Sequence, residues 1–69
     1  MGSPRFVFEW HITMRNERMG YGKSFVVEGM NHRDAIERAR AELADGGRYN
    51  PDEFDVIELA RKSIVRRAA

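Results

Sequence analysis

Hydrophobic and polar residues near the start of the chain alternate strictly. Large apolar side chains occupy every second position from residue 6 to residue 14, and mostly polar ones lie between them. Because successive side chains of a strand point to opposite faces, this pattern predicts a strand with one buried face and one largely hydrated face. The hydrated, open face of this strand would carry Val7, Glu9, His11 and Thr13.

A second alternating stretch, over residues 21–29, predicts a partner for this strand. The connection contains Gly20, which can supply the positive φ that a hairpin turn often requires. A register that sets Trp10 opposite Phe25 or Val27 brings the two apolar faces together, whereas a slip by one residue would bury the polar face. The first third of the chain therefore predicts a β-hairpin.

Residues 32–45 have the pattern of a helix. Asn31 is a suitable N-cap, because its side-chain oxygen can accept a hydrogen bond from the free N–H of Asp34. The glycines at positions 46 and 47 are suited to the left-handed conformations that end helices. The inner stripe of this helix would consist of Ala35, Ile36, Ala39 and Leu43.

The segment over residues 54–60 fits two structures. Asn50 followed by Pro51 resembles the start of a second helix. The segment itself is short and apolar on both parities, as is typical of a strand that is covered on both sides. A lone hairpin is marginally stable, and a third strand beside the first would complete a sheet that one helix can cover. We therefore favour a strand over residues 54–60, with a second helix as the alternative.

The sequence predicts a single small α+β domain over residues 1–69. Its element order is β-β-α-β, with a three-stranded antiparallel sheet in the order 2-1-3 and one helix packed on one face. The basic segment over residues 61–69 would form a short helix or a tail. A domain this short gains only roughly 3–5 kcal/mol from its core, so we expect a homodimer, joined through the open sheet face or through a sheet edge.

The amino-acid composition indicates the cellular compartment and the kind of organism from which the protein comes. The net charge is +1. The chain has no cysteine. The absence of cysteine excludes disulfides, thiolate chemistry and a cysteine zinc site, and it favours the cytoplasm. No apolar run approaches the roughly 18 residues that a membrane span needs. Ten of the twelve basic residues are arginine and alanine is frequent. Both amino acids have GC-rich codons, which indicates a high-GC source such as an actinobacterium or one of its phages.

Candidate chemistry is sparse. The segment from Gly20 to Ser24 resembles the end of a phosphate-binding loop, but Glu17 stands where that loop needs a glycine, and a strand follows instead of a helix. His11 and His32 lie far apart and have no thiol beside them, which is a weak metal signal. No serine, histidine and aspartate arrangement is recognisable. We therefore expect no enzyme activity, no metal and no cofactor.

Apolar residues on the open face are the stronger signal. Val7 and Val26 would lie there together with one apolar parity of the third strand, either Ile57 and Leu59 or Phe54 and Val56. An exposed apolar patch marks a partner site, unless Ile64 and Val65 fold back over it. We expect a protein partner, with contacts from Val7, His11, Val26, Ile57 and Leu59. The alternative partner is nucleic acid, contacted by Arg61, Lys62, Arg66 and Arg67.

Most of the chain takes part in one resemblance. The pattern runs through Trp10, Gly29-Met30-Asn31, Asp34-Ala35-Ile36, Ala39 and Val56-Ile57-Glu58-Leu59. It resembles small uncharacterised proteins encoded by actinobacteriophages and their hosts. The apolar open-face patch and the absence of a recognisable catalytic arrangement lead us to expect a small non-enzymatic interaction module, in the form of a phage-encoded protein that binds and modulates a host protein. The resemblance transfers no functional residue.

Overall fold

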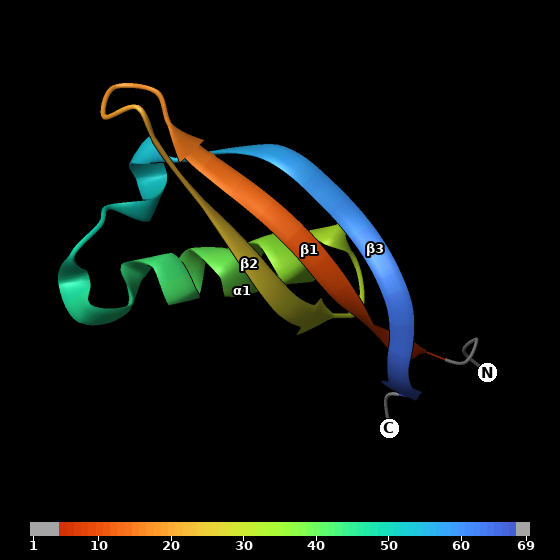
Figure 1. The fold of residues 1–69 in the computed structure, drawn as a ribbon. Coiled ribbons are helices and arrows are strands. Elements are labelled where there is room, and N and C mark those ends of the chain that lie inside the picture. Colours follow the sequence, from red (N-terminus) through yellow and green to blue (C-terminus); the bar gives the residue numbers. More distant parts are fainter. Residues whose placement is uncertain (1–4, 68–69) are drawn as a thin grey trace.

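The computed structural model describes residues 5–67, which form three strands and one α-helix. Figure 1 shows the helix behind the sheet. The strands form one antiparallel sheet in the order β2-β1-β3, so the predicted fold class is confirmed. Two single turns of 3-10 helix, η1 and η2, connect the helix to the last strand. The elements are β1 (Phe6–Asn16), β2 (Tyr21–Gly29), α1 (His32–Ala44), η1 (Asp45–Gly47), η2 (Pro51–Glu53) and β3 (Asp55–Arg67).

The hairpin of β1 and β2 has the predicted parity. Trp10 lies opposite Val27 and Ile12 lies opposite Phe25, so the apolar sides of both strands meet on the helix side of the sheet. The turn places Gly20 at a φ of 65°, in the left-handed region. The register between β1 and β2 runs without interruption from end to end.

Strand β3 is longer and less regular than predicted. It extends from Asp55 to Arg67, so residues 61–67 continue the strand and form neither a short helix nor a tail; residues 68 and 69 lie outside the described residues. This extension pairs with the first half of β1, whose backbone groups would otherwise lack partners on that side. The register between β1 and β3 shifts three times, and such bulges bend a strand. Figure 1 shows the resulting curvature of β3.

Helix α1 begins as predicted and ends one residue earlier. The Asp34 amide donates to Oδ1 of Asn31 at 2.9 Å, and the Met30 amide donates to Oδ2 of Asp34 at 3.0 Å. These two bonds satisfy backbone donors at the start of the helix. Gly46 and Gly47 follow the helix with φ values of 83° and 70°.

The core lies between α1 and the helix side of the sheet. A close approach at Gly29 sets the fit, because a Cβ built there would lie 2.9 Å from the Ala35 amide nitrogen. The Gly29 carbonyl also accepts a hydrogen bond from Nε1 of Trp10 at 2.9 Å. The buried apolar residues of this core are Trp10, Ile12, Met14, Phe25, Val27, Ala35, Ala39, Leu43 and Phe54.

The loop between α1 and β3 is fastened to the helix and to the hairpin. Arg40 of α1 donates to the Pro51 carbonyl at 2.7 Å and to the Phe54 carbonyl at 3.3 Å. Tyr49 stacks on Tyr21 of the hairpin with ring centroids 5.3 Å apart. These contacts hold the beginning of β3 in place beside β1.

Candidate interaction surface

Helix α1 covers only part of its side of the sheet. It packs chiefly against β2 and makes few contacts with β3. Figure 1 shows α1 crossing behind β2 and β1. Opposed residues of an antiparallel pair point to the same face, so the partners of Met14, Ile12, Trp10 and Phe8 lie on the helix side. These partners on β3 are Val56, Leu59, Arg61 and Ile64.

The uncovered part of this side is apolar. Ile64 is 56% exposed and Leu59 is 38% exposed, although both share the face that carries the core. Phe6 and Met30 are exposed by a similar fraction, and Phe8 is half-buried against the core. We call this surface the overhang patch; it consists of Phe6, Phe8, Met30, Leu59 and Ile64.

A shallow groove lies at one end of the overhang patch. It has a volume of about 380 Å³ and runs between the start of β1 and the residues that precede α1. Phe8 connects this groove to β3, because it lies opposite Ile64. The lining residues are Arg5, Phe6, Phe8, Met30 and Asn31.

Cations border the overhang patch. The Arg61 guanidinium lies over the Phe8 ring, 4.6 Å from its centroid. Arg67 lies opposite Phe6, and Arg5 lines the groove. Within residues 5–67, Arg5, Arg61 and Arg67 form no ion pair with a carboxylate, since the ion pairs of this region involve other arginines. The patch is therefore apolar with a positively charged border.

The residues predicted to form a partner site on the open face do not lie together. Val7 is only 8% exposed, and Arg66, which lies opposite it, pairs with Glu28 across β1. Leu59 lies on the helix side, opposite Ile12. The expectation that Val7 and Leu59 join an exposed open-face surface is therefore corrected.

Three predicted contact residues remain exposed. Val26 is 62% exposed and lies opposite His11, whose Nε2 is 3.2 Å from a Glu9 carboxylate oxygen. Ile57 is exposed at a register shift of β3. The open face around them is largely polar, with a hydrogen bond of 3.0 Å between the hydroxyls of Thr13 and Ser24. The alternative in which Ile64 and Val65 fold over this face is also wrong, because both belong to β3 and stay exposed.

The basic residues predicted to contact nucleic acid are distributed over β3. Arg61 lies on the helix side and Arg66 on the open side, as their partners Trp10 and Val7 show. The side chain of Arg66 is engaged in its ion pair with Glu28. These positions do not form one continuous basic surface.

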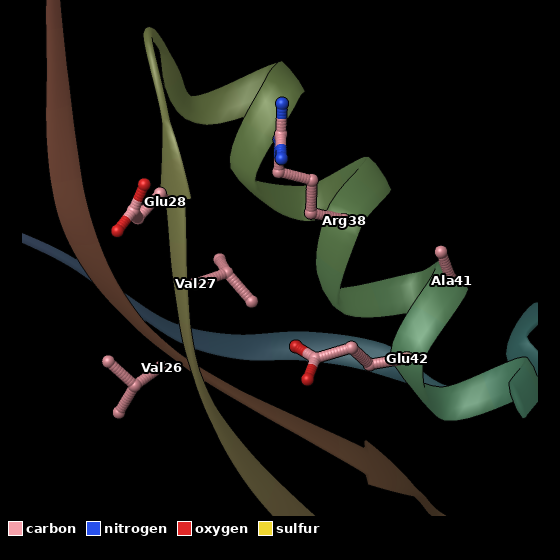
Figure 2. Close-up of a pocket in the computed structure, with 6 residues that line it drawn as sticks. All are labelled: Val26, Val27, Glu28, Arg38, Ala41 and Glu42. Atoms are coloured by element: carbon pink, nitrogen blue, oxygen red, sulfur yellow. The ribbon is translucent and has the colours of Figure 1, made fainter.

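A second groove lies between the edge of β2 and α1. It has a volume of about 370 Å³ and is lined by Val26, Val27, Glu28, Arg38, Ala41 and Glu42. Figure 2 shows Val27 pointing toward the helix, while Val26 and Glu28 point away from it. Arg38 lies 3.5 Å from the Asp34 carboxylate and Glu28 pairs with Arg66, so two of the three charged residues are already engaged.

Residues 5–67 contain no group of three or more His, Cys, Asp or Glu side chains that could hold a metal ion. The pKa of Tyr21 is raised above its ordinary value, first because its hydroxyl bonds with Tyr49 and then because of burial. Asn16 is buried at the end of β1, where Oδ1 accepts from the Met19 amide at 3.0 Å. Both features serve the hairpin and its neighbouring loop, far from the overhang patch.

Comparison with known proteins adds no functional assignment. No protein-family model, curated protein or solved structure matches the chain. Within residues 5–67, no helix is long and apolar enough to cross a membrane.

Proposed function

We propose that this protein is a non-enzymatic interaction module that binds another polypeptide chain through the overhang patch. The observation that carries the proposal is the position of Leu59 and Ile64, which lie on the core side of the sheet and yet are not covered by α1. A sheet with one apolar face normally buries that face in a second layer. A contiguous apolar surface left exposed marks a site for a partner.

The overhang patch supplies a modest amount of binding free energy by itself. Full burial of a large apolar side chain contributes about 1.5–3 kcal/mol, and four residues of the patch are already about half-buried. Covering them therefore contributes roughly 1 kcal/mol each. This total is of the same size as the lower estimates of the entropy lost on association. A stable complex thus requires polar contacts as well, and the bordering cations are available to make them.

The composition indicates where the partner is found. The predominance of arginine and alanine indicates a high-GC source. Together with the resemblance to actinobacteriophage proteins, this leads us to propose a phage-encoded protein that binds and modulates a protein of its actinobacterial host.

Capture from an actinobacterial lysate tests the proposal when two matched variants accompany the wild-type protein. Ile64→Asp places a charge in the overhang patch, and Val26→Asp makes the same kind of change at an equally exposed valine on the open face. We expect Ile64→Asp to lose partners that Val26→Asp retains. Circular dichroism should show that both variants are folded. Retention of the same partners by Ile64→Asp would show that the overhang patch is not the binding surface.

Self-association is tested with the same proteins. Light scattering at micromolar concentration shows whether the wild-type protein is the homodimer that its small core favours. A dimer that Ile64→Asp converts to a monomer would identify the partner as a second copy. A dimer that Val26→Asp alone disrupts would place the interface on the open face and contradict the proposal.

A further inference from the structure

We infer that the partner element which covers the overhang patch is an amphipathic helix whose apolar stripe is flanked by Asp or Glu. This inference rests on the proposed function and specifies its ligand. Two separate observations carry it: the space beside α1, and the sign of the charges around that space.

By the general spacings of strands and helices, the sheet is wide enough for a second helix beside α1. Neighbouring strands are about 4.8 Å apart, so the three-stranded sheet is about 10 Å wide between its outer strands. Packed helices lie about 8–10 Å apart. Because α1 lies chiefly over β2, a helix over β3 would contact both the overhang patch and α1. Arg40 contacts the Pro51 and Phe54 carbonyls just before β3, and Ile36 lies one turn earlier on the same flank of α1. Ile36 is half-buried and would extend the apolar contact.

A strand is a poorer occupant than a helix at this place. A strand would have to pair with the free edge of β3, and the register of β3 shifts at three points along its length. Bulges and charged residues are the features by which edge strands resist pairing. The overhang patch lies on the face of the sheet and belongs to the layer that α1 occupies.

The charges around the space are cationic. The acidic residues of β3, Asp55 and Glu58, lie opposite Arg15 and Thr13 and therefore belong to the open side. On the helix side, β3 contributes Arg61 and Arg67. Stacking on the Phe8 ring orients the Arg61 guanidinium and leaves its in-plane N–H groups available to donate to a carboxylate. Burial of this contact by a partner would strengthen it.

A nucleic acid would match the charge of this surface and not its apolar part. In a duplex the bases are stacked on one another, so the phosphates can pair with the cations while nothing covers Leu59, Ile64 and Met30. Tight binding of duplex DNA is therefore a result that would contradict the inference.

The experiment uses two stapled helical peptides with the same leucine stripe. Glutamates flank the stripe in one peptide and lysines flank it in the other, and fluorescence anisotropy measures binding to the full chain. We expect the Glu peptide to bind at least about tenfold more tightly than the Lys peptide. Arg61→Glu should weaken the Glu peptide by about tenfold and strengthen the Lys peptide. Arg48→Glu makes the same change of charge near Tyr21, at the hairpin end, and should leave both affinities unchanged.

Each other result overturns the inference. Equal affinity for the two peptides, no binding of the Glu peptide, or no effect of Arg61→Glu would exclude an acidic helix as the ligand. Duplex DNA that binds more tightly than the Glu peptide would assign the cations to nucleic acid, if the logarithm of its binding constant falls with the logarithm of the salt concentration by about 0.9 per phosphate neutralised. If Ile64→Asp also loses its captured partner while the Glu peptide fails to bind, the proposed function stands and only the acidic helix is excluded.

Discussion

Gly29→Ala tests the contact that positions α1 on the sheet. The added Cβ would lie 2.9 Å from the Ala35 amide nitrogen and 3.2 Å from its Cα, both backbone atoms of the first helical turn. Carbon atoms in contact ordinarily lie about 3.5–4.0 Å apart, so the strand or the helix must move. Such movement also disturbs the hydrogen bond from Trp10 to the Gly29 carbonyl.

The expected destabilisation is a large part of the total stability. Forcing an extra methyl group into a packed site costs about 1–3 kcal/mol. Domains gain about 0.05–0.15 kcal/mol of stability per residue, which gives roughly 3–10 kcal/mol for this chain. A loss of about 2 kcal/mol should lower the Tm by about 8–16 °C.

Urea unfolding followed by the fluorescence of Trp10, the chain's single tryptophan, measures the effect. Gly22→Ala is the matched control, because it lies in the same strand and its Cβ would meet only the Met14 carbonyl oxygen at 3.4 Å. This control should be neutral or more stable by about 0.4–1 kcal/mol, since alanine restricts the unfolded chain. Equal stabilities of Gly29→Ala and Gly22→Ala would refute the close approach of α1 to β2.

Three other contacts give further predictions. Asn31→Ala removes the oxygen that caps the Asp34 amide and should cost about 1 kcal/mol in urea unfolding, whereas Asn31→Asp should retain the cap; equal losses would argue against it. Asn16→Asp places a carboxyl at a buried position, where burial raises its pKa, so the variant should be less stable at neutral pH than in mild acid; no pH dependence of unfolding would contradict this. Tyr49→Phe removes the bond that raises the pKa of Tyr21, so an absorbance titration should show that pKa lowered. A folded-state pKa above the unfolded value means that the protonated Tyr21 contributes to stability. In the wild-type protein this contribution should be lost as the pH rises through the pKa of Tyr21, and Tyr49→Phe should lack this loss.

The hairpin and the helix could be predicted because their signals are local. The alternation around Trp10 specifies which face of β1 is buried, and the oxygen of Asn31 indicates where α1 begins. Both signals lie within a few residues of the structure that they determine. The choice of a strand for residues 54–60 used the pairing needs of the sheet and is confirmed in β3.

The overhang patch could not be predicted from alternation. Val56 and Leu59 are three positions apart and both lie on the helix side, which a strand of strict period two does not allow. The register shift between their partners moves one residue of β3 out of the ladder. The low exposure of Val7 could not be predicted either, because Arg66, which lies opposite Val7, forms an ion pair with Glu28 from a strand that is distant in sequence.

The most direct measurement is an NMR titration of the isotope-labelled protein with the Glu peptide. If the uncovered side of β3 is the binding surface, amide shifts should change most at Leu59, Arg61 and Ile64, and the change should extend to Ile36 of α1. The amide of Val26, whose side chain lies on the opposite side of the sheet, should change little. Shifts centred on Val26, or spread evenly over both faces, would contradict the claim that the overhang patch is where this protein meets its partner.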